Sequence, residues 1–273
     1  MSRRVAKRIS REEMLYEISQ RMKFKRSEDY ETLEEVFDKP TLMSLYKLMV
    51  KGTIGEVYGT IRAGKECRLY WGRTPEGRDI AIKIYLTSTT EFKKGRLIYM
   101  EGDPRFEGLL GRSTRALVYA WARKEFRNLR RALEAGVRVP EPLDIEKNIL
   151  VMEFIGQDGV PAPLMKEVPL EDPEGVFWKL MEYVRLLYQR ARLVHGDLSE
   201  YNVMIWDGEP VLFDLSQAVT LDHPMAEFFL ERDLRNLLRF FSRLGLPVPS
   251  LQEALRMVRE GAEEEGEVVG SVE

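Results

Sequence analysis

One stretch, residues 193–216, constrains the chain more than any other. It sets a histidine, two aspartates and an asparagine among apolar residues of the kind that form strands. His195, Asp197 and Asn202 follow the spacing His-x-Asp-x-x-x-x-Asn, and Asp214 comes directly after a short apolar run. The sequence Trp-Asp-Gly-Glu between the two apolar runs predicts a hairpin. That hairpin would return Asp214 to the same end as Asn202.

The residue types in this stretch suit one chemistry. The spacing is that of a kinase catalytic loop. Phosphoryl transfer needs a carboxylate that orients or deprotonates the acceptor, and metal ligands that spread the developing charge. Asp197 is the candidate base, while Asn202 and Asp214 offer the hard oxygen ligands that suit Mg²⁺ or Mn²⁺. The alternative is a solvated loop and a surface hairpin whose aspartate caps another segment. We favour the catalytic interpretation because a plausible nucleotide-binding region precedes the stretch.

Composition narrows the class of protein. The chain has 273 residues, of which 44% are apolar and 32% charged, and its net charge is −3. This length can bury a good core and suggests one or two domains. No apolar run is long enough to span a membrane, and the N-terminal residues lack the apolar core of a signal peptide. One cysteine and two histidines argue against a disulfide and against a metal site built from these residue types. We therefore expect a cytoplasmic protein.

The lysine that would hold ATP phosphates is Lys83, in an apolar run of the Val-Ala-Ile-Lys type. We predict that residues 61–72 form the hairpin that covers the nucleotide, because the turn-forming residues 74–78 would join it directly to the lysine strand. A second glycine-rich stretch, 52–59, competes for this role. Choosing that stretch would insert an extra strand, so we interpret it as a separate strand. The candidate nucleotide contacts in the chosen hairpin are Gly64, Lys65 and Glu66.

A strong helix is expected over residues 113–135, closed by Gly136. Glu125 falls on its apolar stripe, and a buried carboxylate needs a cation. Lys83 is the natural partner, in the Lys–Glu pair that positions a kinase nucleotide. The opposite face is basic. It is either a solvated surface or a surface that contacts RNA phosphates. Its members are Arg123, Arg127, Arg130 and Arg131.

An apolar strand over residues 148–156 is interpreted as the hinge between two lobes. There the backbone carbonyl of Glu153 and the amide of Ile155 would contact adenine. A proline-rich linker then leads to a helix capped by Asp172, whose apolar stripe delivers the chain to His195. Two further helices are expected, one starting at residues 222–224 and one over 251–259.

Four regions follow from these patterns. Residues 1–48 form a basic, helical N-terminal extension, and 49–155 an N-lobe with a flexible loop at 86–112. Residues 156–260 form a C-lobe, and 261–273 an acidic, disordered tail. The basic residues of the extension either contact phosphates or lie on a solvated terminus. They are Arg3, Arg4, Lys7, Arg8 and Arg11, followed by Lys23, Lys25 and Arg26.

Six stretches occur in a fixed order within residues 45–245: Ala63-Gly-Lys65-Glu66, Ile82-Lys-Ile-Tyr85-x-Thr87-Ser88, Lys124-Glu-Phe-Arg-Asn128-Leu, Leu150-Val-Met-Glu-Phe-Ile155, Val194-His-Gly-Asp-Leu-Ser-Glu-Tyr-Asn202 and Asp214-x-Ser-Gln-Ala-Val219. Together they resemble the RIO atypical protein kinases, specifically the first, archaeal and eukaryotic, type. One departure from that family lies in the phosphate loop. There Arg62-Ala63 stands where the family usually has Ser-Thr, and Cys67-Arg68 stands where it has Ala-Asn. Arg62 or Arg68 would have to substitute electrostatically for the lost hydroxyls.

The resemblance implies an α+β, bilobal protein-kinase-like fold of the trimmed RIO type, with a β-rich N-lobe and a mainly helical C-lobe. It implies ATP with Mg²⁺, serine phosphorylation, and ATPase activity during small ribosomal subunit maturation. Asp197 would be the catalytic base, and Asp214 would carry a phospho-aspartate. The implied partner is a pre-small-subunit particle, with rRNA contacts through the basic N-terminus and the four helix arginines.

Two other classes of function stay open. One is a small-molecule phosphotransferase of the aminoglycoside-kinase kind, which shares the His-Gly-Asp sequence. The other is a nucleotide-gated RNA-binding module with negligible turnover. The intact Asp197, Asn202 and Asp214 argue against the second of these.

Overall fold

The structure is a computed structural model that describes residues 11–22, 37–87 and 95–260. The chain divides into two compact units. Helix α5 (Thr114–Glu134) belongs to both, because the first unit ends within it at Arg127 and resumes at Pro140. Within the described ranges, no helix has both the length and the apolar character needed to cross a membrane. Of the described residues, the first unit holds 11–22, 37–87, 95–100, 105–127 and 140–162, and the second holds 101–104, 128–139 and 163–260.

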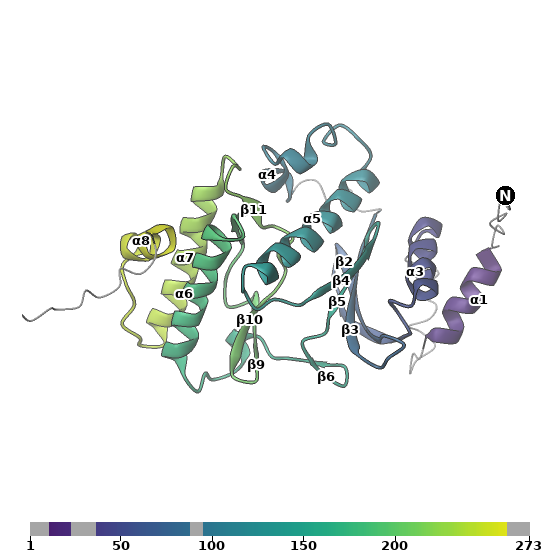
Figure 1. Ribbon diagram of the computed structural model, residues 1–273, viewed down its shortest axis with the longest axis horizontal. Helices are drawn as coiled ribbons and strands as arrows, with labels where there is room; N and C mark the ends of the chain where they lie inside the picture. Colours follow the sequence, from purple (N-terminus) through teal and green to yellow (C-terminus); the bar gives the residue numbers. More distant parts are fainter. Residues whose placement is uncertain (1–10, 23–36, 88–94, 261–273) are drawn as a thin grey trace, which may run out of the picture. The chain divides into compact units, whose positions relative to one another are not determined.

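A five-stranded antiparallel sheet is the centre of the first unit (Figure 1). Its strand order is β1-β2-β3-β5-β4. Because side chains alternate across a strand, the isoleucines of β3 lie on one face, and Lys83 lies on the other with Ala81 and Tyr85. The strands are β1 (Glu56–Ala63), β2 (Cys67–Arg73), β3 (Asp79–Tyr85), β4 (Pro142–Glu146) and β5 (Ile149–Glu153).

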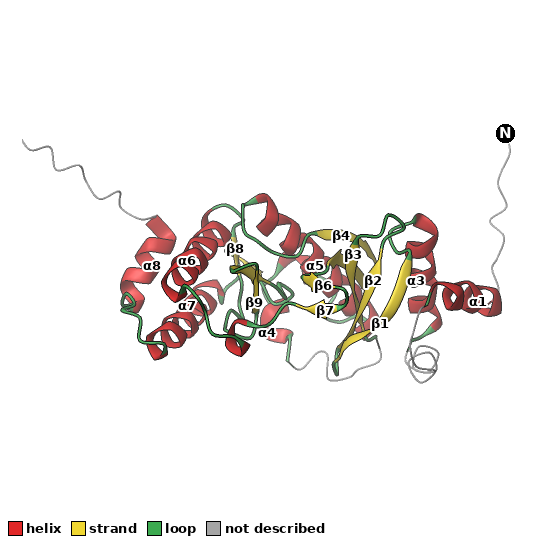
Figure 2. Ribbon diagram, turned by 90° about the horizontal axis from the view of Figure 1, so that it is seen from below, coloured by secondary structure: helices red, strands yellow, loops and turns green. Residues whose placement is uncertain are grey.

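Helices α1 (Arg11–Arg21) and α3 (Lys39–Lys51) share a core with the isoleucine face of the sheet (Figure 2). The carboxylate of Asp38 caps α3 by accepting the N–H of Thr41 at 2.9 Å, and Gly52 ends the helix with a left-handed φ of 84°. The shared core includes Met14, Ile18, Leu42, Leu45, Leu48, Ile80, Ile82 and Ile84.

The predicted nucleotide hairpin is present but longer than expected. Strands β1 and β2 pair from Glu56 with Arg73 to Ala63 with Arg68. Residues 56–59 are therefore the first half of β1, and the interpretation of 52–59 as a separate strand is wrong. The reason is that β2 continues to Arg73 and supplies partners along the whole of β1. The turn at 74–78 lies where the sequence predicts it, and residues 64–66 connect β1 to β2.

The segment after β3 is more regular than predicted. It contains the short helix α4 (Leu97–Met100) and a 3₁₀ turn, η2 (Pro104–Phe106). Phe106 and Tyr99 are buried, and their ring centroids lie 6.0 and 6.5 Å from that of Trp121 on α5. Residues 97–100 and 104–106 of the expected flexible loop 86–112 therefore form regular secondary structure, while residues 88–94 lie outside the described part of the chain.

The second unit is mainly helical, with one short hairpin and one further antiparallel pair of strands. Asp172 caps its first helix by accepting the Gly175 N–H at 2.9 Å, as predicted. The next helix begins at Ala226, later than expected, because the His223 ring accepts the Met225 N–H and holds the preceding residues in a turn. The unit comprises α6 (Pro173–Gln189), α7 (Ala226–Arg243), α8 (Leu251–Glu260), η3 (Met165–Glu167) and the pairs β8 (Leu193–Val194) with β11 (Val219–Thr220) and β9 (Val203–Trp206) with β10 (Glu209–Leu212).

Candidate active site

The β9–β10 hairpin brings Asn202 and Asp214 to one end, as the sequence predicts. Its turn residues Asp207 and Gly208 both have left-handed backbones, with φ of 51° and 80°. This is the conformation of the two-residue turns that match strand twist. At the open end of the hairpin, the Phe213 N–H donates to the Asn202 carbonyl at 3.2 Å. Asn202 thus accepts the last hydrogen bond between the two chain segments, and Asp214 directly follows its donor.

Asp197 is held by two side-chain amides. The Asn202 Nδ2 donates to the Asp197 carbonyl at 2.6 Å and to its Oδ2 at 3.1 Å. The Gln217 Nε2 donates to the same Oδ2 at 3.3 Å. Burial raises the pKa of the Asp197 carboxyl above its ordinary value, although the hydrogen bond from Asn202 acts in the opposite direction. The arrangement suits a general base whose plane is fixed by its neighbours.

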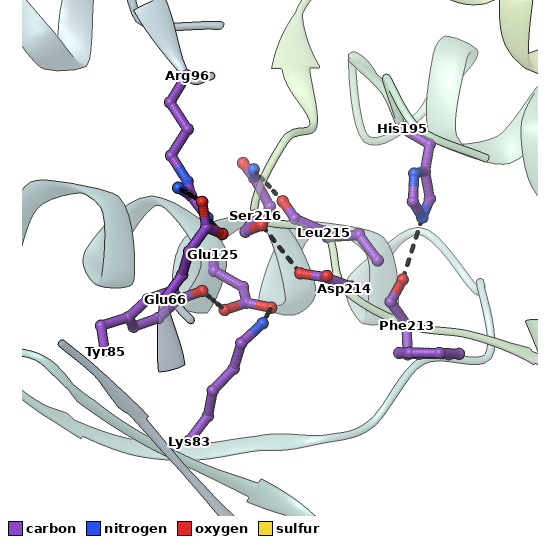
Figure 3. A network of polar contacts seen from close by, with 11 residues as sticks. Glu66, Lys83, Tyr85, Arg96, Glu125, His195, Phe213, Asp214, Leu215 and Ser216 are labelled. Atoms are coloured by element: carbon purple, nitrogen blue, oxygen red, sulfur yellow. Dashed lines mark hydrogen bonds and ion pairs between the residues drawn. The ribbon is translucent and has the colours of Figure 1, made fainter. Parts of the chain in front are cut away.

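The orientation of Asn202 fits a metal ligand. Its amide nitrogen is taken up by Asp197, so its carbonyl oxygen faces no donor among the described residues. Asp214 has a left-handed backbone, with φ of 58°, and its Oδ1 accepts the Ser216 hydroxyl at 2.9 Å (Figure 3). Among the described residues, no three His, Cys, Asp or Glu side chains cluster as a metal cage. Mg²⁺ would thus need phosphate and water oxygens beside these two side chains, which is its usual coordination.

The backbone of the catalytic loop is fixed by α7. Asp233 is buried, and its two oxygens accept the Gly196 and Leu198 N–H groups at 2.8 and 2.9 Å. Burial raises the pKa of this carboxyl to about 7, against the lowering effect of the two backbone hydrogen bonds and of Arg232. Arg232 in turn donates to the Gly196 carbonyl. Asp233 was given no role from the sequence, although a carboxylate at a core position is itself a signal.

His195 is a buried structural residue. Its Nε2 lies 3.2 Å from the Phe213 carbonyl (Figure 3), and burial lowers the pKa of the ring. A neutral ring that donates through Nε2 fits these surroundings. The imidazole therefore joins the catalytic loop to the segment that precedes Asp214.

In the first unit, the predicted pair between Lys83 and Glu125 is present. The Lys83 Nζ lies 2.7 Å from the Glu125 Oε1, and both side chains are nearly buried (Figure 3). The hydroxyl of Tyr85, two residues after the lysine on the same strand face, donates to the other glutamate oxygen. This third member of the network was not anticipated. It holds the glutamate from the sheet while the lysine engages it.

The turn at Gly64, Lys65 and Glu66 closes the β1–β2 hairpin. The Gly64 N–H donates to the Cys67 carbonyl at 3.0 Å, and Lys65 is exposed. The carboxylate of Glu66 is paired with the Arg96 guanidinium, whose centre lies 5.2 Å from the Trp121 ring. Glu66 therefore contacts the segment that contains α4. Of the three, Lys65 is the side chain that projects into solvent.

Arg68 does not lie on the phosphate side of the sheet. It pairs with Ile84, whereas its neighbour Leu69 pairs with Lys83. By strand alternation, Arg68 therefore shares the isoleucine face that α3 covers. The idea that Arg68 replaces the missing hydroxyls is wrong, and Arg62, which is exposed on β1, is the arginine that stays available.

The expected hinge residues end β5. The Glu153 side chain accepts the Glu141 N–H at 3.1 Å. The Ile155 carbonyl accepts the Ala162 N–H at 2.9 Å, at the base of the hairpin β6 (Gly156–Gln157) and β7 (Val160–Pro161). The amide of Ile155 has no hydrogen bond to another described residue. This N–H is thus available to donate a hydrogen bond to an acceptor such as an adenine nitrogen.

On the basic face of α5, Arg123, Arg127 and Arg130 are exposed and Arg131 is partly buried. Arg123 and Arg127 form no ion pair within the described residues, and Arg130 lies 3.7 Å from Glu134. Arg131 reaches the Arg192 carbonyl at 3.5 Å. The basic residues before Arg11 and between 23 and 26 lie outside the part of the chain that the structure describes.

Three polar residues near the site were not assigned from the sequence. Asn128 is fully buried on α5, and its Nδ2 donates to the Leu215 and Ala218 carbonyls at 2.9 and 3.0 Å. Ser216 and Gln217 lie between those two carbonyls. A buried amide three residues after Glu125 on the same stripe was the available signal for Asn128.

The structure thus contains the parts of a protein-kinase-like phosphotransferase: a lysine–glutamate pair beside a sheet, and an Asp-Asn-Asp set on a loop and hairpin. A family model for the RIO domain matches residues 68–254. The chain is 46% identical over 225 residues to the RIO-type serine/threonine-protein kinase Rio1 of Haloferax volcanii, which covers 82% of this chain and 77% of that one. The chain therefore belongs to the RIO family of serine/threonine-protein kinases.

Further relatives agree with this assignment. The Rio1 kinase of Methanocaldococcus jannaschii is 43% identical over 79% of this chain and 73% of its own. The human RIO1 kinase is 41% identical over 233 residues. The aligned part covers 84% of this chain and 41% of the human protein. Among solved structures, the Rio2 kinase of Chaetomium thermophilum superposes with a TM-score of 0.61 at 24% identity, over 82% of this chain and 70% of that one. At this sequence identity, the similarity to the Rio2 structure shows the fold alone.

Proposed function

We propose that this kinase binds ATP with Mg²⁺, or with Mn²⁺, and transfers the γ-phosphate with Asp197 as base and Asn202 and Asp214 as metal ligands. The observation that carries the proposal is the orientation of Asn202. Its nitrogen donates to Asp197 at 3.1 Å and its oxygen is left for a cation. One amide thereby links a base to a metal site, which is its role in kinase catalytic loops.

The first unit would supply the nucleotide contacts. Lys83, held by Glu125, would bind the phosphates, and the Glu153 carbonyl and Ile155 amide would bind adenine. Lys65 is the member of the 64–66 turn best suited to reach a phosphate, because Glu66 is paired with Arg96.

Asp214 is also proposed as a transient phosphate acceptor. A carboxylate oxygen would form a bond to the γ-phosphorus while the bond to the β–γ bridging oxygen breaks and ADP leaves. Water would then hydrolyse the acyl phosphate. A solved Rio2 kinase of Chaetomium thermophilum is described as a complex with ADP, Mg²⁺ and phosphoaspartate.

We further propose a place of action on pre-small-ribosomal-subunit particles in the cytoplasm. The exposed arginines of α5, of which Arg123 and Arg127 make no ion pair among the described residues, would contact rRNA phosphates with the basic N-terminus. Each phosphate contact that is lost should reduce the slope of the logarithm of the binding constant against the logarithm of the salt concentration by about one unit. Arg123→Gln with Arg127→Gln tests this against Arg239→Gln with Arg243→Gln, two equally exposed arginines on α7.

The deciding experiment measures ATP turnover with and without purified small-subunit particles, for the wild type, Asp197→Asn and Asp214→Ala. Particle-stimulated turnover that both substitutions abolish supports the proposal. Turnover that ignores particles and responds to an added hydroxylated metabolite would favour a small-molecule kinase. Binding to particles without turnover would favour the nucleotide-gated RNA-binding module.

A further inference from the structure

We infer that Gln217 is a positioning residue that selects which oxygen of Asp197 receives the acceptor proton. The inference deepens the proposed function, since it rests on Asp197 acting as the base. In the step considered, the serine oxygen bonds to the γ-phosphorus, the bond from that phosphorus to the β–γ bridging oxygen breaks, and ADP leaves with the electron pair. The serine proton passes to Asp197.

The two oxygens of Asp197 are not equivalent in this structure. Oδ2 accepts from Asn202 at 3.1 Å and from Gln217 at 3.3 Å. Oδ1 accepts no hydrogen bond from the described residues. A free carboxylate can rotate and exchange its two oxygens, whereas two donors on one oxygen fix the plane of the group. The geometry therefore presents Oδ1 to the acceptor.

The two donors on Oδ2 also give the two oxygens of the carboxylate different roles. Each hydrogen bond draws charge toward Oδ2 and stabilises the ionised form. Oδ1 keeps its lone pairs for a proton, and a base must lie within hydrogen-bond reach of the proton it takes. Asn202 alone cannot secure this arrangement, because its amide also donates to the Asp197 carbonyl and its oxygen is proposed to bind metal. Gln217 has no such second task among its described contacts.

A rigid segment carries Gln217. Asn128 holds the carbonyls of Leu215 and Ala218, on either side of it, at 2.9 and 3.0 Å. In the same segment, the Ser216 hydroxyl donates to Asp214 at 2.9 Å. Two adjacent side chains thus orient the two catalytic carboxylates, Ser216 to Asp214 and Gln217 to Asp197. Support of this kind keeps a reacting group within the small tolerance that catalysis requires.

The residue type fits the task. A neutral amide donates to a carboxylate without pairing its charge, whereas lysine or arginine would form an ion pair and weaken the base. A glutamate at this position would place a second negative charge beside Asp197 and displace its carboxylate. Gln217→Met keeps nearly the same shape and removes the donor, while Gln217→Glu keeps the shape and reverses the interaction.

The test measures transfer of γ-phosphate from ATP to dephosphorylated casein as a probe acceptor, with ADP affinity measured separately. Gln217→Met should lower kcat by about 10- to 100-fold, the effect of a misplaced reacting group, and leave ADP affinity and the KM for ATP within about twofold. Gln217→Glu should be slower than Gln217→Met. The matched control is Gln189→Met, because Gln189 also donates one amide hydrogen bond within the same unit, to Val258 at 2.9 Å, and its kcat should not change.

Asp197→Asn separates this inference from the proposed function. If Asp197→Asn keeps the wild-type kcat, the base assignment fails. If Asp197→Asn is inactive while Gln217→Met keeps the wild-type kcat, the proposed function stands and the role of Gln217 is overturned. Adding Gln217→Met to Asp197→Asn should cause no further loss, and an additive loss would show that Gln217 acts elsewhere. Equal losses in Gln217→Met and Gln189→Met would indicate a general effect on folding and would also overturn the inference.

Discussion

The Nζ of Lys83 lies 2.7 Å from the Oε1 of Glu125, and the two side chains are 10% and 1% exposed. Such a pair contributes little net stability, because the desolvation of both ions offsets their attraction. Removing one partner is different, since the other ion then stays nearly buried and loses this hydrogen-bonded partner. The Tyr85 hydroxyl, which donates to the same carboxylate, would also lose its acceptor.

We therefore expect Glu125→Ala to lower the free energy of unfolding by about 3–5 kcal/mol. The double variant Lys83→Met with Glu125→Leu should lose clearly less, because no uncompensated charge is left. Urea unfolding of the three proteins measures the difference. The control is Glu182→Ala, whose half-exposed pair with Lys179 at 2.9 Å should contribute at most about 0.5 kcal/mol. A double variant less stable than Glu125→Ala would contradict this account.

Asp233 should make stability depend on pH. Burial raises its pKa from an ordinary 3.8 to about 7 in the folded chain. Between those values the folded state binds more protons than the unfolded state, so stability falls as the pH rises. The contribution is complete below about pH 4 and is lost by the time the pH has passed 7. Asp233→Asn removes this titration.

The measurement is the difference in free energy of unfolding between wild type and Asp233→Asn at several pH values. The wild type should lose stability relative to Asp233→Asn as the pH rises from 4 to 7. Above pH 8 the difference between the two proteins should be constant. A difference that is constant across this range would mean that Asp233 is ionised throughout, with the two backbone N–H groups of Gly196 and Leu198 outweighing its burial.

The two histidines of the chain allow a direct spectroscopic prediction. The His195 Nε2 faces the Phe213 carbonyl at 3.2 Å, and the His223 Nδ1 accepts the Met225 N–H at 3.1 Å. Both rings should therefore carry their proton on Nε2. His195 should also stay neutral below its ordinary pKa of 6.5, because burial lowers its pKa. Nitrogen chemical shifts between pH 5 and 8 check both statements, with His223→Gln to assign the signals. A His195 ring charged at pH 6 would contradict the second.

Local patterns were sufficient for most elements and for the ion pair. The helix α5 has a clear apolar stripe, Asp172 and Pro173 mark the start of α6, and Asp207-Gly208 marks the β9–β10 turn. Each of these signals lies within a few residues of the feature it specifies. Lys83 and Glu125 could be paired because a carboxylate on an apolar stripe needs a cation, and the sequence offers one on an apolar strand.

Features that depend on distant partners could not be predicted. Helix α4 is too short to show a period, and it forms where Tyr99 packs on Trp121. The full length of β1 depends on how far β2 runs. The hydrogen bonds of Asn128 and Gln217 join segments that only the folded chain brings together. In each case the local sequence permits several structures, and tertiary contacts select among them.

Asn128 should connect stability with catalysis. Its amide satisfies the buried carbonyls of Leu215 and Ala218. Asn128→Leu keeps the branched shape of the side chain and removes both donated hydrogen bonds. The Ala218 carbonyl is then left without a donor among the described residues, at about 1–3 kcal/mol, while the Leu215 carbonyl keeps the Ala218 N–H at 3.2 Å. The segment that carries Ser216 and Gln217 would then lose its anchor, so kcat should fall about tenfold or more at a temperature where the protein is fully folded. Leu237→Ala, a buried truncation in α7 expected to cost about 2–5 kcal/mol, supplies a variant of similar stability. If that variant loses as much kcat as Asn128→Leu, lowered stability explains the effect; if it keeps its kcat, the anchor of the 215–218 segment does.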